Sequence, residues 1–124
     1  MTGYMYNTNF MTALNCCQQI LPHMKAAGWG RIINMGPHTA ASGMLLAGPY
    51  CASKAAAHSL SRTISLENCN GVTCNAIMPG IIDTPTNRKN MPDTDHSGWV
   101  TLGVLSQNIE KMLPSNENGL LLEI

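Results

Sequence analysis

Tyr50 and Lys54 are two residues whose types and spacing suit proton transfer. A four-residue step on a helix places a phenol and an ammonium on one face. A free tyrosine has a pKa of about 10, so it is a poor acid at neutral pH, but a nearby cation stabilises the phenolate and lowers that pKa. The pair therefore predicts a proton donor to a carbonyl during hydride transfer. Because Y-x-x-x-K is common by chance, a surface helix face is the competing interpretation.

The cysteines have no spacing that indicates a disulfide framework or a metal centre. They are Cys16, Cys17, Cys51, Cys69 and Cys74, an odd number without a C-x-x-C pair. This pattern favours reduced thiols in a cytoplasmic protein and predicts no metal site. A thiol enzyme that uses Cys16 or Cys51 is the alternative, but no His or Asp stands one helical turn from either residue.

The composition excludes several classes of partner. Seven basic and seven acidic residues give a net charge of zero, so no basic surface for nucleic acid is expected. No apolar run approaches the roughly 20 residues that span a bilayer, and the first residues do not have the pattern of a signal peptide. With 44% hydrophobic and only 11% charged residues, the chain is expected to pack as one small domain, within a larger body or an oligomer.

Hydrophobic periodicity predicts alternating helices and strands. Helices are expected at 9–27, 50–67 and 99–113, strands at 31–35, 72–78 and 120–124, and loops at 36–49 and 83–98. This order indicates an α/β protein whose parallel strands are joined by crossover helices. The near-continuous apolar character of residues 31–35 predicts a strand that is buried on both faces.

The first helix has recognisable boundary residues. Thr8 is the predicted N-cap, and Gly28 stands where a helix commonly ends. Pro22 lies inside the periodic pattern and is expected to kink the helix or end it early.

Several separated segments together resemble the short-chain dehydrogenase/reductase family. They are Asn9, Gly30-Arg31-Ile32-Ile33-Asn34, Tyr50-x-x-x-Lys54 and Asn75-Ala76-Ile77-Met78-Pro79-Gly80-Ile81-Ile82-Asp83-Thr84. The resemblance extends from Asn9 to the end of the chain. It implies a partial Rossmann-like, doubly wound parallel sheet, made of the C-terminal three strands and their flanking helices. It also implies an oxidoreductase that uses NADH or NADPH.

The resemblance assigns roles to particular residues. Asn9 matches the family's asparagine that holds a water of the proton relay, Tyr50 the general acid, and Lys54 the lysine that binds the nicotinamide ribose and lowers the tyrosine pKa. Tyr50 and Lys54 thus also count among the cofactor-binding residues. The remaining cofactor-binding residues are implied in the loop at the nicotinamide end: Pro79, Gly80, Ile82 and Thr84.

The resemblance also implies partners. The helices at 9–27 and 50–67 match the pair through which many relatives form homo-oligomers. The polar stretch after Thr84 matches the loop that binds a small-molecule substrate. Within it, Asp83-Thr84-Pro85-Thr86-Asn87-Arg88-Lys89-Asn90-Met91-Pro92-Asp93-Thr94-Asp95 is similar to the dihydropteridine reductase branch. A carbonyl or a quinonoid dihydropteridine is then the expected hydride acceptor.

The chain departs from the family pattern at the catalytic serine. The family places it thirteen residues before the tyrosine, where this chain has Pro37, which has neither a hydroxyl nor an N–H. The dihydropteridine reductase branch also lacks this serine, so its absence does not exclude activity. His38, Thr39 or Ser42 could replace it, although each also suits an ordinary loop residue.

A second departure concerns the nucleotide phosphates. A dinucleotide fold holds the pyrophosphate at a strand, a glycine-rich turn and a helix N-terminus. Gly28-Trp29-Gly30 has the reverse context, after a helix and before a strand. Residues 1–124 are therefore interpreted as the C-terminal, catalytic half of a reductase domain without its phosphate-binding half. The strand at 31–35 would then have one unpaired edge, and the isolated chain is expected to fold poorly or to need a partner.

Two functions of different classes remain after these arguments. One is the NAD(P)H-dependent reductase, and the other is a truncated, inactive remnant that dimerises through its two long helices. The retained Asn9, Tyr50, Lys54 and Thr84 favour the reductase, whereas the missing phosphate site favours the remnant.

Overall fold

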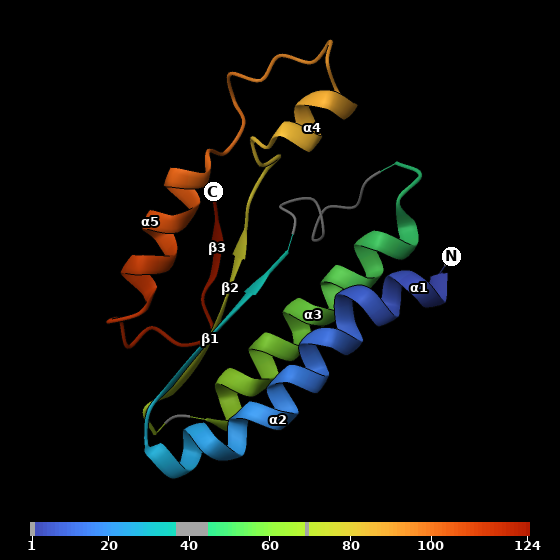
Figure 1. Cartoon of the computed structure of the whole chain (residues 1–124). Helices are drawn as coiled ribbons and strands as arrows, with labels where there is room; N and C mark the ends of the chain where they lie inside the picture. The colour runs from blue at the N-terminus through green and yellow to red at the C-terminus, as the bar shows by residue number, and fades with distance from the viewer. Residues whose placement is uncertain (1, 37–44, 69) are drawn as a thin grey trace.

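A parallel three-stranded sheet lies between helices in the computed structural model, which describes residues 2–36, 45–68 and 70–124. The strands are β1 (Gly30–Met35), β2 (Val72–Met78) and β3 (Leu121–Glu123), in the order β1-β2-β3. Figure 1 shows α2 (Thr12–Ala27) and α3 (Gly48–Glu67) on one face of the sheet and α5 (Leu102–Met112) on the other. The predicted α/β fold with a doubly wound parallel sheet is confirmed.

The first helical segment begins earlier than the sequence predicted. Helix α1 (Thr2–Tyr6) runs into a π-helical turn, η1 (Asn7–Met11), and then into α2. Thr8 is therefore not an N-cap, because it lies inside the π-helical turn and its carbonyl oxygen accepts a hydrogen bond from Thr12 Oγ1. Pro22 does not end the helix. Gly28 does end it, as predicted, with φ at +67°, a backbone conformation that glycine adopts without strain.

The prediction that residues 31–35 form a strand buried on both faces is wrong for this chain. Ile33, Asn34 and Met35 of β1 are half-buried, whereas all seven residues of β2 are buried. The reason is position in the sheet, because β2 pairs on both sides and β1 pairs only with β2 among the described strands. The predicted unpaired edge of this strand is thus present.

The later elements follow the predicted order with shifted boundaries. Helix α3 begins two residues earlier than expected, with Pro49 in the first turn, where its missing N–H costs nothing. The region 83–98, expected to be a loop, contains a short helix, α4 (Pro85–Asn90), because the Thr84 hydroxyl caps it. Helix α5 is shorter than the expected 99–113, and β3 lies within 120–124. Of the expected loop 36–49, residues 37–44 lie outside the described part of the chain.

Small and sulfur-containing side chains form the core between α2, α3 and the sheet. Cys17, Ile32, Ile64 and Cys74 make up this cluster, with Leu21, Met24 and Leu60 packed against it. Burial, more than the neighbouring Cys17, raises the pKa of Cys74 to about 11. The cysteines of the described residues are free thiols, as expected, and this one is a core residue, not a nucleophile.

Two searches of the described residues bear on other functions. No helix among them has the length and apolarity to cross a membrane. No cluster of three His, Cys, Asp or Glu side chains with the geometry of a metal site occurs in those same ranges.

Candidate active site at the carboxyl end of the sheet

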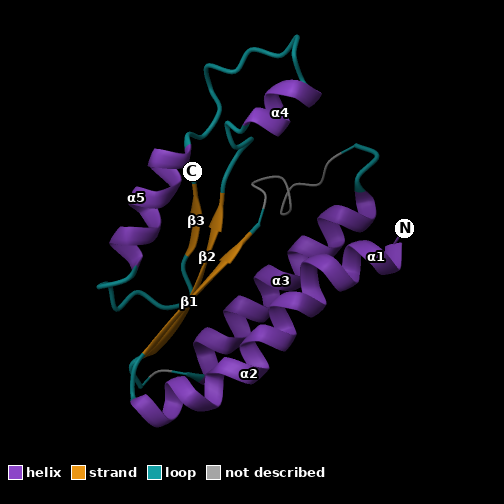
Figure 2. Cartoon of the chain, viewed as in Figure 1, coloured by secondary structure: helices purple, strands orange, loops and turns teal. Residues whose placement is uncertain are grey.

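The residues expected to do chemistry gather where the three parallel strands end. Figure 2 shows β1, β2 and β3 pointing the same way, with the N-terminal end of α3 and helix α4 beyond their tips. In open α/β sheets this edge is where ligands bind. The topology therefore brings Tyr50 and Lys54, on the first turns of α3, to the edge that also carries the loop after β2.

Lys54 reaches from α3 to the end of β1. Its Nζ donates a hydrogen bond to the main-chain carbonyl oxygen of Met35, the last residue of β1, at 3.3 Å. The side chain is half-buried, and this burial lowers the pKa of its ammonium. The cation therefore lies in the site, held by a neutral oxygen that a ligand hydroxyl can replace.

Tyr50 does not have the electrostatic environment that the sequence predicted. Burial raises the pKa of its half-buried phenol, and the neighbouring Cys51 thiol adds to the rise. The expectation that Lys54 lowers this pKa is thus wrong for the chain alone. The physical reason is that the ammonium is directed at the Met35 carbonyl, while the phenol has lost part of its hydration.

Asn9 is brought against α3 by the π-helical turn. Its Nδ2 donates to Ser53 Oγ at 3.1 Å, and Ser53 Oγ donates to the carbonyl oxygen of Tyr50 at 2.8 Å. Ser53 is fully buried, and the sequence arguments missed this link between Asn9 and the helix turn that carries Tyr50 and Lys54. The available signal was a small hydroxyl directly before Lys54, on the same turn of the helix as the predicted pair. Single π-helical turns inside α-helices occur frequently at functional sites.

A pocket of about 290 Å³ lies between the first helical segment, β1 and α3. It is lined by Thr8, Asn9, Thr12, Ala13, Cys16, Asn34, Met35, Lys54 and Ala57. The structure thus brings Asn9 and Lys54 into one cavity, but Tyr50 does not line it. The lining is mixed: the Lys54 ammonium, the Asn9 and Asn34 amides and the threonine hydroxyls could bond the hydroxyls of a sugar, and the remaining side chains are apolar or sulfur-containing.

The four predicted cofactor-binding residues of the loop after β2 lie together at the end of that strand. Pro79 is buried, and the Gly80 N–H donates to the carbonyl oxygen of the C-terminal residue, Ile124, at 2.9 Å. Ile82 pairs with Val100 in an isolated bridge, and its carbonyl oxygen accepts from Asn87 Nδ2 at 2.8 Å. These contacts give the loop a fixed shape.

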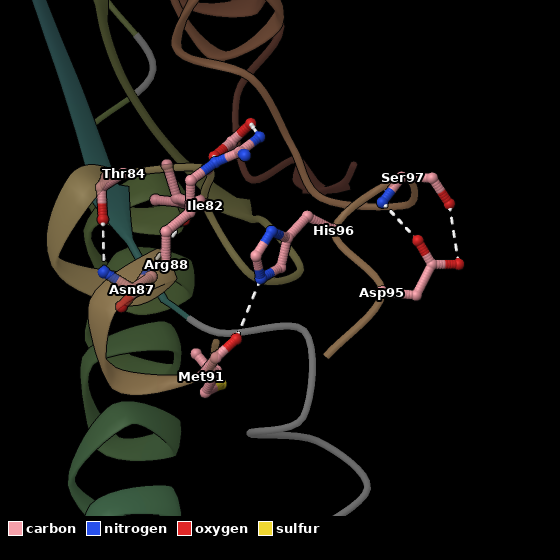
Figure 3. A network of polar contacts seen from close by, with 9 residues as sticks. Ile82, Thr84, Asn87, Arg88, Met91, Asp95, His96 and Ser97 are labelled. Atoms are coloured by element: carbon pink, nitrogen blue, oxygen red, sulfur yellow. Dashed lines mark hydrogen bonds and ion pairs between the residues drawn. The ribbon is translucent and has the colours of Figure 1, made fainter. Parts of the chain in front are cut away.

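Thr84 has a defined structural role in this loop. Its Oγ1 accepts a hydrogen bond from the Asn87 N–H at 3.1 Å, which caps α4 (Figure 3). A hydroxyl that accepts in this way still has its own hydrogen to donate. The cap is therefore compatible with the expected contact to a carboxamide.

The predicted substrate loop at 83–98 is a folded unit. Arg88 makes two hydrogen bonds to the Asp83 carboxylate, at 2.5 and 2.7 Å, and these hold the pKa of that carboxyl below its usual range. His96 Nε2 donates to the Met91 carbonyl oxygen at 2.9 Å, and its ring lies 4.2 Å from that of Trp99. Figure 3 shows the hydrogen bond from His96 to Met91 and the Arg88 side chain beside the capped helix. Short polar contacts thus give a predicted loop defined structure.

Two predicted departures from the family pattern have different outcomes. Pro37 and its possible substitutes, His38, Thr39 and Ser42, lie outside the described residues. Gly28-Trp29-Gly30 joins α2 to β1, as the sequence indicated, and the Arg31 guanidinium lies 4.9 Å from the Trp29 ring centre. Within the described ranges, no strand is followed by a glycine-rich turn and a helix of the kind that holds a pyrophosphate.

Comparisons with known proteins agree with this geometry. The family described as short chain dehydrogenase matches residues 3–95. D-beta-hydroxybutyrate dehydrogenase of Rhizobium meliloti is 36% identical over 98 residues, which are 75% of this chain and 36% of that protein. NADPH-dependent pterin aldehyde reductase of Arabidopsis thaliana is 37% identical over 78 residues, 63% of this chain and 32% of that protein.

Solved structures share the fold. The structure of ElxO with NADP bound superposes with a TM-score of 0.85 at 24% identity, covering 94% of this chain and 53% of that one. The chain thus spans about half the length of this solved structure and about a third of the two curated relatives. The family match over most of the chain, together with the parallel sheet and the Asn9, Tyr50 and Lys54 positions, shows that this chain belongs to the short-chain dehydrogenase/reductase family.

Proposed function

We propose that this chain is the proton-transfer half of an NAD(P)H-dependent reductase. The observation that carries the proposal is the placement of the Lys54 ammonium and the Asn9 amide in one pocket at the carboxyl end of the sheet, one helical turn from Tyr50. A partly buried lysine without a carboxylate partner is uncommon where its only role is structural, because burial disfavours the charged ammonium. This placement favours a ligand-binding lysine over a surface helix face.

Lys54 would hold the nicotinamide ribose. Its ammonium would leave the Met35 carbonyl and donate to the ribose hydroxyls, in a pocket that Asn9 also lines. When bound, the dihydronicotinamide supplies the hydride. Tyr50 donates its phenolic proton to the substrate oxygen, and the ammonium, once turned into the site, stabilises the phenolate that remains.

The loop after β2 would hold the nicotinamide end. Pro79, Gly80 and Ile82 form its fixed backbone, and the Thr84 hydroxyl has a free hydrogen for the carboxamide. Because hydrogen bonds already fix this loop, little conformational entropy is lost when a ligand binds to it.

The substrate would be a carbonyl compound or a quinonoid dihydropteridine. The resemblance of residues 83–99 to the dihydropteridine reductase branch motivates the quinonoid acceptor, and one relative is named a pterin aldehyde reductase, which points to a carbonyl on a pterin. A conjugated quinonoid system is already polarised, so it depends less on the serine that Pro37 replaces.

The phosphate-binding elements would pair with β1. The edge of this strand away from β2 has no partner among the described residues, and an unpaired edge accepts another strand. We propose that a strand, a glycine-rich turn and a helix outside the described elements dock there.

A titration of NADH and NADPH, followed by nicotinamide fluorescence, tests the proposal. We expect binding in the micromolar range that Lys54→Ala abolishes. Lys111→Ala, in the last turn of α5, is the matched control and should bind as the wild type does. Equal binding by wild type and Lys54→Ala would contradict the proposed role of this residue.

A second function, a non-catalytic dimerisation module, is favoured by the surface of α3. Ala52 and Ala55 are exposed on a helix that lies beside α2, so a second helix pair can approach closely (Figure 2). Sedimentation of wild type and Ala55→Arg would detect such a dimer. A dimer that Ala55→Arg disrupts, together with no nucleotide binding, would support this function over the reductase.

A further inference from the structure

His58 is a buried histidine to which the proton-transfer site gives no role. Its side chain is 8% exposed, and its Nε2 is enclosed without a hydrogen-bond partner among the described residues. On α3 it follows Lys54 by four residues, so the two side chains lie on one face of the helix. An unpartnered buried nitrogen is costly, so a side chain that only filled space here would be apolar.

The His58 ring lies directly against Gly36. A Cβ added to Gly36 would lie 1.9 Å from Nε2 and 2.7 Å from Cε1 of the ring. Gly36 is not among the glycines with positive φ, so its backbone would accept any residue. The imidazole is therefore the reason that position 36 has no room for a side chain.

Gly36 shares a peptide unit with the carbonyl group on which Lys54 rests. The Gly36 N–H donates to the carbonyl oxygen of Ile77 on β2 at 2.9 Å. The oxygen of the same planar unit, on Met35, accepts from Lys54 Nζ. Because the unit is rigid and the ring fills the space beside Gly36, a movement of the ring that lets Gly36 shift also turns that carbonyl.

We propose that His58 is a positioning residue for Lys54: its ring, which reaches from α3 on one face of the sheet, acts as a wedge beside the Met35–Gly36 peptide and so helps to set where the ammonium lies. Burial, and after it the Lys54 charge, lower the pKa of His58, so the ring stays neutral and does not repel the ammonium. The inference rests on the proposed function, in which Lys54 binds the nicotinamide ribose. The placement itself is measurable without any nucleotide.

Competitive acetylation, read for each lysine by mass spectrometry across a pH series, measures the Lys54 environment in the full chain. Lys25, Lys89 and Lys111 serve as internal references for the reagent. In His58→Ala, water enters beside Gly36 and the ammonium loses its fixed carbonyl. We expect the Lys54 rate relative to the references to change by about threefold or more, the effect of half a pKa unit. In His58→Gln, whose amide reaches the Nε2 position, it should stay near the wild-type rate.

Two further variants separate positioning from general stability. Leu60→Ala removes a comparable volume from the same helix, where it packs against the core cluster, and should leave Lys54 labelling unchanged. Gly36→Ala forces the ring away and should change Lys54 labelling. The double variant with Gly36→Ala and His58→Ala should label at the same rate as His58→Ala alone, because the ring is already absent. Circular dichroism first establishes that each variant is folded.

Two outcomes would overturn the proposal. One is unchanged Lys54 labelling in a folded His58→Ala, and the other is an equal change in Leu60→Ala. If His58→Ala does not fold, Gly36→Ala decides, since unchanged labelling there excludes the wedge. A failed NADH titration would contradict the reductase but not this placement, so the two failures are distinguishable.

Discussion

Asn9 and Ser53 are joined by a hydrogen bond of 3.1 Å, from the asparagine Nδ2 to the serine Oγ, although 44 residues separate them in the chain. The bond ties the π-helical turn to the first turns of α3, directly beside Lys54. Because Ser53 also donates to the carbonyl oxygen of Tyr50, it connects Asn9 to Tyr50, two residues that the sequence indicated, although the sequence did not indicate Ser53 itself.

Ser53→Ala should lower the stability of the chain. The variant leaves the part-buried Asn9 amide without its acceptor and removes the bond to the Tyr50 carbonyl, a loss of about 1–3 kcal/mol. Urea unfolding followed by circular dichroism measures the change. Ser59→Ala, at an exposed position of the same helix, is the control and should stay within about 0.5 kcal/mol of the wild type. Equal stability of the two variants would show that the Asn9 contact contributes nothing.

Tyr50→Phe should abolish proton donation to the substrate. Loss of a general acid lowers kcat by about 10²–10⁴-fold. Steady-state reduction of a carbonyl substrate by the full enzyme measures it, with Tyr6→Phe as a control that keeps activity, since Tyr6 is an exposed residue of α1. Because burial raises the pKa of Tyr50 in the chain without ligand, its hydroxyl is protonated at neutral pH and is available as the acid. Wild-type turnover in Tyr50→Phe would refute the assignment.

Thr84→Ala should open the first turn of α4. The variant removes the cap on the Asn87 N–H, worth about 0.5–2 kcal/mol at a helix N-terminus. Hydrogen exchange of the Asn87 amide should become faster by about 2- to 30-fold, the same free energy expressed as a rate. Thr84→Ser keeps the hydroxyl and should exchange as the wild type does. Faster exchange in both variants would mean that the methyl group, not the cap, orders the helix.

Arg88→Ala should return the pKa of the Asp83 carboxyl to its ordinary range. The guanidinium lowers the Asp83 pKa chiefly through its hydrogen bonds, so the variant should raise that pKa toward about 3.9. In the wild type the folded pKa is the lower one. The stabilisation that the Arg88–Asp83 pair contributes is therefore fully present at a pH above the Asp83 pKa of the unfolded chain. It is lost as the pH falls through the lower Asp83 pKa of the folded chain.

An NMR titration of the Asp83 carboxyl carbon measures the effect of Arg88. Lys89→Ala, one residue along α4, is the control and should leave the Asp83 midpoint in place. Arg88→Lys should recover only part of the lowering, because an ammonium lacks the paired donors of a guanidinium. An unchanged midpoint in Arg88→Ala would exclude the ion pair in solution.

The sequence alone determined the family, the order of the three strands and the helices that connect them, but not α1, η1 or α4. Residues 72–78 were predicted as a strand and form β2, and Gly28 was predicted to end a helix and does so with positive φ. Both signals are local, since apolar periodicity and a glycine that tolerates the left-handed conformation act within a few residues. Likewise, the step from Tyr50 to Lys54 determines that both stand on one helical face.

Only the tertiary structure decided where those groups point. The direction of Lys54 toward Met35, the bond from Asn9 to Ser53 and the half-burial of β1 each depend on segments that lie far apart in the chain. Local propensity holds no information about such contacts, because a side chain selects its partner only after helices pack on the sheet and exclude water. For the same reason, the sequence did not predict the raised pKa of Tyr50. The spacing to Lys54 indicated only a nearby cation, whereas the rise comes chiefly from burial in the folded chain.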